Sequence, residues 1–561
     1  MTESHYLVVG AGAAGSVLAS RLSEDPRNSV VLVEAGDDVV PGREPADIRC
    51  VYPLSAFNRA YLWPDTLVHW DDADHGAPVP LPQGRIVGGS SAVMGMWALR
   101  GRPDDYDGWR DAGADGWSWA DVLPYFRKLE RDVDFAGPLH GADGPIPICR
   151  EPSASWPPFA SAVARAAVQG GLPQVDDMNA DFGDGHCSLP ISRHAETRAA
   201  AGICYLDAAV RTRPNLRVLA RLEARSLRIE AGRVTGLQAR ARDGSLHELR
   251  AHETLIAAGA LRSPALLQRS GIGDGDELRA AGIPVLLHRR GVGRNLQNHP
   301  VLYLTSILRS CGRQPRGWRP AGSTYVRFSS GLHGAPIGDL ALYVRSGLSW
   351  NALGRRMASI APLVTRPFAR GSVRLEPTRP DGPPRIEFRF GSEPRDLARL
   401  VQGLQFAVAL YESGPVRKVS GEAWLLADAG RAARFNQRST LSALRAAIVA
   451  GLLDLAPASE RRLLERSQHF RAIHRLADAP DALLELVRTH VTGTGHVCGT
   501  CRIGRVDDAD AVVDAVGRVH GIGGLRVVDA SVMPTVPSGN THIPTVMVAE
   551  KLADALRAER H

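Results

Sequence analysis

Lysine is nearly absent from this chain of 561 residues. Lys128, Lys418 and Lys551 are the only lysines among 67 basic residues, and the rest are arginine. The formal net charge is +7, but no long run of like charges marks a tail of the kind that binds nucleic acid. A general preference for arginine accounts for the positive charge, and we therefore predict no nucleic-acid partner.

Cysteine is also scarce. Seven cysteines, an odd number, are scattered between Cys50 and Cys501, which is not the pattern of a disulfide framework and fits a reducing compartment. Only Cys498 and Cys501 have the spacing of a redox CxxC pair or of half a zinc site. No second cysteine pair supplies further zinc ligands, and no helix start follows a strand here as a redox pair requires. We predict no metal site and interpret the pair as two small apolar side chains in a tight loop.

Long apolar runs are missing as well. Ala446–Leu453 is apolar but much shorter than the roughly 18 residues of a membrane-spanning helix. The polar start, Met1–Ser4, runs at once into the first predicted strand, so a signal peptide could not be removed without destroying the fold. We expect a cytoplasmic protein with no membrane span. The length exceeds one ordinary hydrophobic core and predicts two domains.

A glycine fingerprint stands near the start of the chain. Gly10-Ala-Gly-Ala-Ala-Gly15 follows the apolar run His5–Val9 and precedes a predicted helix over Ser16–Ser23. Gly10 allows the tight turn, Gly12 lets the backbone approach a pyrophosphate, and Gly15 permits close packing of helix and strand. The phosphates would rest at the positive end of the helix. The pattern predicts a dinucleotide site.

An acidic residue follows the fingerprint at the expected distance. Ser29–Glu34 reads as a second strand that ends in a carboxylate about 20 residues after the glycines, where a ribose hydroxyl is expected. We predict Glu34 as the ribose ligand, with Ala35 and Gly36 beside it. NAD and FAD are both open at this point.

A second glycine-rich segment covers Gly84–Met96 and reads as a loop meeting a helix. Arg85, Gly88, Gly89 and Ser90 offer backbone N–H groups, a hydroxyl and a cation, which suit a second contact with a phosphate or a flavin edge. The alternative is a merely flexible loop.

The middle of the chain changes from strands to helices. Alternating polar and apolar residues predict separate strands at Arg217–Ala220, Leu227–Ile229, Val234–Gln238, His247–Arg250 and Thr254–Gly259. Asp396–Tyr411 is predicted to be helical, and so is Ser439–Arg488, apart from breaks near Pro457 and Pro480.

Four later motifs resemble landmarks of the glucose-methanol-choline (GMC) oxidoreductases. They are Gly259–Gly273, Gly291–Pro300, His496–Gly504 and Leu525–Ala553, and the likeness runs in family order from Tyr6 to Asp554. The resemblance implies FAD rather than NAD, and oxidation of a primary or secondary alcohol to the aldehyde or ketone by hydride transfer to the flavin, which oxygen or a quinone-like acceptor then reoxidises.

The family fold is α/β with mixed α+β character. It combines a Rossmann-like FAD-binding domain with an inserted substrate domain of antiparallel sheet flanked by helices. We predict that residues 1–155, 205–300 and 485–561 form the FAD-binding domain and that residues 156–204 and 301–484 form the substrate-binding domain.

The resemblance also implies roles for residues near the end of the chain. His496 matches the family's histidine that faces the flavin, and a neutral imidazole there can take the hydroxyl proton. His542 matches the partner position that holds the substrate oxygen, with Asn540 as the alternative occupant. Asp529 and Ala530 match the return strand that passes the flavin. The predicted cofactor contacts are Gly10, Gly12, Ala13, Ala14, Gly15, Glu34, Ala35, Gly36, Arg85, Gly88, Gly89, Ser90, Met94, Ala224, Asp529, Ala530 and Thr545.

The chain departs from the family pattern at three positions. Met94 stands where an asparagine is common, so backbone contacts would have to hold the cofactor there. Val93 replaces the histidine of members with covalent flavin, and we therefore predict non-covalent FAD. Gly495 replaces an aromatic residue and opens space near the flavin, which allows a bulkier substrate or a mobile loop. The stretch 430–479 is longer than the family usually needs and would cover the entrance or form a dimer contact, so a monomer and a homodimer are both open.

Other interpretations stay open beside alcohol oxidation by an oxidase or a dehydrogenase. A hydroxynitrile lyase of the same fold would keep FAD and both histidines, a NAD-dependent dehydrogenase would share only the first glycines, and a non-catalytic flavin-binding protein would explain Met94 and Gly495. We interpret His299 as a loop anchor. Trp63, Trp70 and Trp97 are expected to pack in the core or a lid rather than line the substrate pocket.

Overall fold

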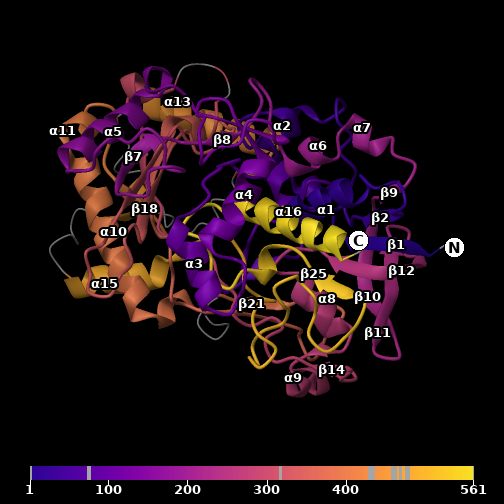
Figure 1. The fold of residues 1–561 in the computed structure, drawn as a ribbon. Helices are drawn as coiled ribbons and strands as arrows, with labels where there is room; N and C mark the ends of the chain where they lie inside the picture. Colours follow the sequence, from indigo (N-terminus) through magenta and orange to yellow (C-terminus); the bar gives the residue numbers. More distant parts are fainter. Residues whose placement is uncertain are drawn as a thin grey trace.

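The computed structural model describes residues 3–71, 77–314, 317, 319–427, 436–455, 464–466, 470–473 and 480–559. Two large sheets organise these residues, and helices flank both of them (Figure 1). Searched over this part of the chain, no helix combines the length and apolar character needed to cross a membrane.

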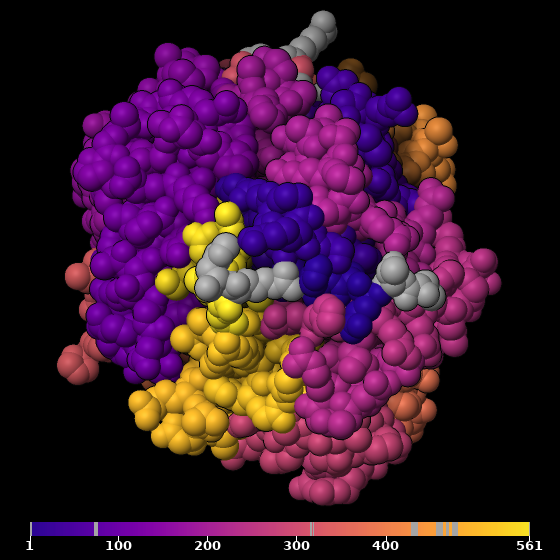
Figure 2. Space-filling view, turned by 45° about the vertical axis from the view of Figure 1, so that its right-hand side comes forward, coloured from indigo at the N-terminus to yellow at the C-terminus, as the bar shows by residue number. Residues whose placement is uncertain are grey.

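The first sheet has a parallel core of five strands. Its order is β9 (Leu216–Leu219), β2 (Val30–Val33), β1 (Ser4–Val9), β12 (Leu246–Ile256) and β25 (Leu525–Val527). Most residues of β1 and β2 are buried, as the faces of a covered parallel sheet require. Helix α1 (Ala13–Leu22) packs against α16 (His542–Ala558), so the two ends of the chain lie side by side (Figures 1 and 2).

A meander extends this sheet on one side. Strands β10 (Leu222–Glu230) and β11 (Arg233–Ala241) pair antiparallel with each other, and β11 pairs with the first half of β12. The two strands predicted at His247–Arg250 and Thr254–Gly259 are therefore one. No glycine or proline interrupts residues 246–256, so a single strand passes from the meander into the parallel core.

The second sheet is antiparallel. Its strands are β7 (Gly185–Ser188), β15 (Pro300–Val301), β16 (Leu304–Ile307), β17 (Thr324–Phe328), β18 (Leu340–Ser346), β19 (Met357–Val364), β22 (Trp424–Leu426), β23 (Phe470–Ala472) and β24 (Thr492–Gly493). Helices α5 (Pro158–Gln169) and α10 (Pro394–Glu412) pack against it, and α15 (Pro480–His490) packs on α10. The predicted helix over Asp396–Tyr411 is confirmed.

The predicted helical stretch Ser439–Arg488 is partly wrong. It contains α13 (Thr440–Leu455) and most of α15, but residues 470–472 form strand β23 beside β22. Phe470 and Ala472 both pack around Trp424, and this two-residue repeat suits a strand, so tertiary packing overrides the helical pattern. Residues 456–463, 467–469 and 474–479 of this stretch lie outside the described residues.

The remaining elements are short and connect the sheets. The helices are α2 (Ala46–Arg49), α3 (Pro103–Asp111), α4 (Trp119–Leu129), α6 (Ala201–Tyr205), α7 (Ala208–Arg211), α8 (Ser263–Arg269), α9 (Gly275–Ala280) and α11 (Gly414–Arg417). The strands are β3 (Leu67–Val68), β4 (Val79–Pro80), β5 (Glu130–Asp132), β6 (Ile146–Cys149), β8 (Ile191–Ser192), β13 (Ile272–Gly273), β14 (Leu287–His288), β20 (Ser372–Arg374) and β21 (Arg385–Glu387). The predicted domain boundaries stay predictions, and β24, inside the range 485–561, pairs with β15 of the second sheet.

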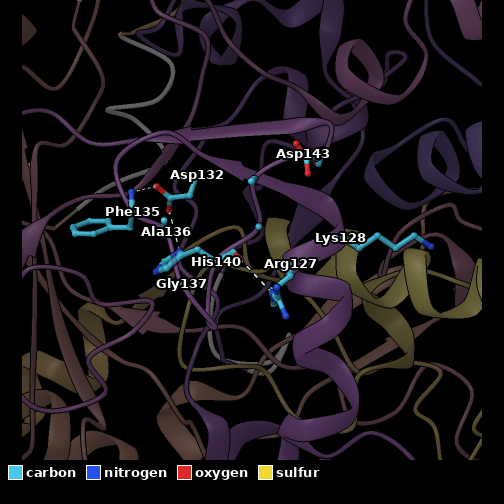
Figure 3. Close-up of a pocket in the computed structure, with 11 residues that line it drawn as sticks. Arg127, Lys128, Asp132, Phe135, Ala136, Gly137, His140 and Asp143 are labelled. Atoms are coloured by element: carbon cyan, nitrogen blue, oxygen red, sulfur yellow. Dashed lines mark hydrogen bonds and ion pairs between the residues drawn. The ribbon is translucent and has the colours of Figure 1, made fainter.

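A buried ion network stabilises the region after α4. His140 lies 3.3 Å from Asp132, 3.4 Å from Glu130 and 3.2 Å from Asp177. It borders a cavity of about 600 Å³ in the segment 127–144, and none of the residues that line this cavity belongs to the predicted site (Figure 3).

The charges of this network balance without a metal ion. Arg100 pairs with Glu130, and Arg150 pairs with both Asp132 and Asp177. Hydrogen bonds to Asp132, Asp177 and Glu130 raise the pKa of His140 from its ordinary value of 6.5 to about 10. The three buried carboxylates therefore face three cations, and the exposed Asp134 also lies 3.5 Å from Arg150. Although Glu130, Asp132 and His140 have the spacing of metal ligands, a cation would have to displace a tightly held proton.

We predict that His140→Gln destabilises the protein by about 3 kcal/mol near neutral pH, because it leaves buried carboxylates without their partner. A pKa raised by folding contributes stability that is present below pH 6.5 and is lost as the pH rises towards 10. The difference in melting temperature between wild type and variant should therefore shrink between pH 7 and pH 10. The exposed His333→Gln serves as control, and parallel pH curves for wild type and His140→Gln would contradict the prediction.

Candidate active site

The glycine turn between β1 and α1 leaves room for little more than backbone. Gly10 has a φ of +101°, and a Cβ atom there would lie 2.5 Å from the carbonyl oxygen of Ala257. A Cβ at Gly15 would lie 1.8 Å from the carbonyl oxygen of Gly10. A Cβ at Gly12, in contrast, would meet nothing within 4 Å. The fold itself thus requires Gly10 and Gly15, whereas Gly12 borders open space.

That open space lies at the N-terminus of α1. Gly12 is the N-cap residue, and no side chain caps the helix. The N–H groups of the first turn, which includes Ala13, Ala14 and Gly15, have no partners within the helix, and the helix dipole adds partial positive charge. An uncapped helix end beside open space is suited to hold a pyrophosphate.

The second glycine loop packs directly on the first. The Gly88 N–H donates to the carbonyl oxygen of Ala11 at 2.7 Å, and a Cβ at Gly89 would lie 2.8 Å from the Gly12 Cα. Ser90 Oγ accepts the Gly84 N–H at 3.1 Å within its own loop. Instead of meeting an α-helix, the loop forms the 3₁₀ turn η4 (Gly89–Ala92).

Glu34 follows β2 and is almost fully buried beside the glycine turn. Its carboxylate accepts the N–H groups of Ala11 at 3.0 Å and Gly36 at 2.8 Å. Burial raises its pKa to about 7, and these backbone N–H groups oppose the rise. Each carboxylate oxygen has a second lone pair, so Glu34 can hold the turn and still accept a ribose hydroxyl.

The other predicted cofactor residues lie around the same turn or near it in the chain. Gly36 packs tightly against the backbone of Arg85, because a Cβ atom at Gly36 would lie 2.0 Å from the Arg85 carbonyl oxygen. Arg85 therefore lies close to Ala35 as well. The Arg85 guanidinium lies over the ring of Trp63. The backbone of Met94 is engaged within the protein, since its carbonyl oxygen accepts a hydrogen bond from Arg198. Ala224 lies on β10, next to a break in its register with β11.

Asp529 connects the return strand to the rest of the first sheet. Its carboxylate accepts the Gly259 N–H at 2.8 Å, the Ser263 hydroxyl at 2.5 Å and the Ser531 N–H at 2.7 Å. It thereby caps η10 (Ala530–Val532). The Thr545 hydroxyl donates to the Thr541 carbonyl inside α16. These contacts are structural, and direct contacts of Asp529, Ala530 and Thr545 with the cofactor stay predictions.

These residues fit FAD. The uncapped helix end and the space before Gly12 suit its pyrophosphate, and Glu34 suits its ribose. Buried polar atoms without a hydrogen-bond partner also occur after β25, at Asn540 Oδ1 and at both ring nitrogens of His542, the first residue of α16. Such atoms are costly unless a ligand engages them.

His496 is held in place by two neighbouring residues of another loop. Strands β15 and β24 pair antiparallel, which sets the segment before Pro300 beside the segment after Gly493. Asn298 Oδ1 accepts the His496 backbone N–H at 3.0 Å, and the Nδ1 atoms of His299 and His496 are 2.8 Å apart.

The hydrogen bonds of His299 determine which nitrogen of His496 carries the proton. His299 Nε2 lies 3.1 Å from the carbonyl oxygen of Pro537, which can only accept, so Nε2 carries the proton. Burial lowers the pKa of His299 to about 4, and the neutral ring leaves Nδ1 as an acceptor. His496 must therefore donate from Nδ1, and its Nε2 has a free lone pair. Burial and the neighbouring His299 also hold the pKa of His496 well below its usual range.

Asn540 lies on the basic side of His496. Its Nδ2 donates to His496 Nε2 at 3.0 Å and to the Tyr343 hydroxyl at 3.2 Å. Because Nε2 carries no proton, it can only accept, and the amide nitrogen of Asn540 must face it. Oδ1 then points to a position without a partner. The structure thus brings Asn540, predicted only as an alternative, into contact with His496.

His542 begins α16 and has no hydrogen-bond partner at either ring nitrogen. Burial, together with the charge of Arg198, lowers its pKa to about 4, so the ring is neutral. A neutral imidazole with both nitrogens buried can exchange hydrogen bonds with a hydroxyl group.

An aromatic side chain, Tyr343, lies beside His496, and a second one packs against it. The Tyr343 ring lies 6.2 Å from the His496 ring, and Trp97 meets Tyr343 edge-on at 4.3 Å. The Trp97 indole N–H is buried without a partner. Trp97 therefore borders the site, whereas Trp70 packs against Phe388 and Phe390 as expected. Gly495 is exposed, and a Cβ there would meet nothing within 4 Å.

Sequence reasoning missed two of these residues. His299 was interpreted as a loop anchor, although a histidine directly after Asn298 in a glycine-rich segment is a signal that could have suggested a polar partner. Tyr343 lies in an ordinary strand and gave no signal. Cys498 and Cys501 are buried free thiols, and burial raises the pKa of Cys498 to about 12, which fits the predicted packing role.

Comparison with known proteins agrees with this geometry. Two family models, both described as GMC oxidoreductase, match residues 4–301 and 367–549. The 5-(hydroxymethyl)furfural oxidase of Methylovorus sp. (strain MP688) is 39% identical over 98% of both chains. The oxygen-dependent choline dehydrogenase of Sinorhizobium fredii (strain NBRC 101917 / NGR234) is 31% identical over 98% of this chain and 95% of its own. The crystal structure of pyridoxine 4-oxidase from Mesorbium loti superimposes with a TM-score of 0.82 at 28% identity and covers 100% of both chains.

The fold agrees as well. A Rossmann-like domain carries the glycine turn, and a second domain is built on a large antiparallel sheet, as the resemblance implied. The chain therefore belongs to the GMC oxidoreductase family and is an FAD-dependent enzyme that oxidises CH–OH groups.

Proposed function

We propose that this enzyme oxidises aryl- or heteroaryl-methyl alcohols to the aldehyde, with His496 as the base. The observation that supports this best is the unprotonated Nε2 of His496 beside Tyr343, against which Trp97 packs. Flat aromatic rings favour stacked or edge-on contacts with aromatic walls. The names of two similar proteins, a 5-(hydroxymethyl)furfural oxidase and a pyridoxine 4-oxidase, point to the same substrate class.

In the proposed mechanism, the substrate hydroxyl displaces the Asn540 amide from His496 and donates its hydrogen bond to Nε2. His496 then takes the hydroxyl proton, and His542 donates a hydrogen bond to the substrate oxygen as it becomes more negative. FAD, when bound, supplies the acceptor for the hydride that leaves the carbinol carbon. His299 keeps the proton of His496 on Nδ1, so Nε2 is a base before the substrate arrives.

We further propose non-covalent FAD, because the fully buried Val93 has no nucleophilic atom. The proposed acceptor is oxygen, in line with the oxidase name of the 39% identical relative. A cytoplasmic location is proposed from the seven free cysteines. Reduced enzyme that stays reduced in air but is reoxidised by a quinone would argue for a dehydrogenase.

Gly12→Ala should separate cofactor binding from folding. Its Cβ meets no protein atom, so the variant should fold, but the methyl group enters the space proposed for the pyrophosphate. We expect FAD content after gel filtration to fall at least about tenfold, the effect of a loss of about 1.4 kcal/mol, with unchanged secondary structure by circular dichroism. Gly108→Ala, also without a neighbour within 4 Å, is the matched control. Full FAD content in Gly12→Ala would place the pyrophosphate elsewhere.

His496→Ala should remove the base and lower the rate of anaerobic flavin reduction by about 10²–10⁴-fold. Stopped-flow bleaching with benzyl alcohol and with cyclohexylmethanol, which has a similar shape but no aromatic ring, tests base and substrate class together. Wild type should prefer the aromatic alcohol. Equal bleaching by wild type and His496→Ala would refute the base, and equal rates with both alcohols would refute the aromatic substrate class.

His299→Ala should lower kcat at least about tenfold with little change in KM, since one hydrogen bond worth about 1.5 kcal/mol no longer orients the base. In His299→Asn, the amide oxygen is bonded to Cγ, as Nδ1 is in histidine. It can therefore accept the hydrogen bond from His496, and the variant should restore part of the rate. Wild-type kcat/KM should fall only at a pH below the ordinary range of histidine, because the neutral form is active and the pKa of His496 is lowered. A merely structural role for His299 would leave this acid limb unmoved in His299→Ala.

A further inference from the structure

Helix α13 (Thr440–Leu455) is apolar on two opposite faces. Its inner face buries Ala446, Ala450 and Leu453, and Leu453 packs in a cluster around Trp424. Its outer face exposes five large aliphatic side chains: Leu441, Leu444, Ile448, Leu452 and Leu455, each with 54–86% of its surface accessible. A helix that is apolar all round is normally covered on all sides, and an apolar row of this kind marks an interaction surface.

The outer row is self-complementary. Its members follow one another at intervals of 3, 4, 4 and 3 residues, which is the 3.5-residue period of a coiled-coil seam. The same intervals read identically in both directions from Ile448. Two antiparallel copies related by a two-fold axis would therefore set Leu441 against Leu455 of the partner subunit, Leu444 against Leu452 of the partner subunit, and Ile448 against its own equivalent. Such matching of a surface with itself is what a two-fold interface requires.

Small residues beside the row allow close approach. Ala447 is exposed on the outer face, and a Cβ at Gly451 would meet nothing within 4 Å. Both charged residues of α13, Arg445 and Asp454, lie outside the apolar row, so the row itself carries no charge.

The charges nearby favour a second copy over an anionic membrane. A helix that lies on a membrane typically presents free basic side chains next to its apolar face. Here Arg313 and Arg356 both pair with Asp454 at 2.6 Å, and Arg438 pairs with Asp47 at 3.0 Å. Figure 1 shows α13 at the periphery of the molecule, on the side of the second sheet, where a second copy can approach.

We propose that the outer face of α13 is the two-fold interface of a homodimer. Five aliphatic side chains from each copy form the seam, and Ile448 lies on the axis.

Analytical ultracentrifugation of the FAD-loaded enzyme tests the interface with Ile448→Glu, which sets two like charges on the axis. Wild type should sediment as a dimer at micromolar concentrations, and the variant should raise the dimer dissociation constant at least about tenfold. Ile337→Glu, at an equally exposed isoleucine outside α13, is the matched control. FAD content and melting temperature of Ile448→Glu should equal those of wild type, as expected for a change on an exposed face.

A second variant detects the axis directly. Ile448→Cys should form a disulfide-linked dimer under mild oxidation, whereas Ile337→Cys should not, because only a residue on the axis meets its own equivalent. Three results would each overturn the proposal: a wild-type monomer at all concentrations, a dimer that Ile448→Glu leaves intact, and a monomer that binds anionic vesicles through Ile448.

Discussion

The carbonyl oxygen of Pro537 can only accept a hydrogen bond, and this constraint directs the protons of His299 and His496. It places a proton on Nε2 of His299, which leaves Nδ1 of that ring to accept from His496. The proton of His496 is thereby held on the side away from Asn540. A backbone atom, which no side-chain titration can change, thus decides that the imidazole nitrogen on the reactive side is a base rather than an acid.

Burial supports the same state. The rings of His299, His496 and His542 all have lowered pKa values because charging them would cost solvation, and for His496 the adjacent His299 adds to the effect. Neutral rings are what alcohol oxidation needs, since a protonated His496 could not accept the hydroxyl proton. The same burial makes a full charge on His496 unstable, so the proton it accepts must be released again before the next turnover.

The sequence predicted the local geometry of the glycine turn better than the surroundings of His496. The glycine turn, Glu34 and the second glycine loop are local features, and the steric demands that make Gly10 and Gly15 necessary act between residues close in the fold. His299, Tyr343 and the position of Asn540 depend on pairing between segments about 200 residues apart, which no local pattern contains. Strand β23 was missed for a similar reason, because its conformation follows from packing around Trp424 rather than from its own sequence.

The register of one short strand pair brings together the two loops that carry His299 and His496. Pro300 lies opposite Gly493 and Val301 opposite Thr492, which brings Asn298 and His299 level with Thr494 and His496. A slip of one residue would turn each side chain to the opposite face, and His299 would no longer reach His496. Asn298 resists such a slip, because its amide oxygen accepts both the Thr494 hydroxyl and the His496 N–H. Since Asn298 is fully buried, a shifted register would leave that amide without partners, and the cost of burying it unpaired favours the register that the base requires.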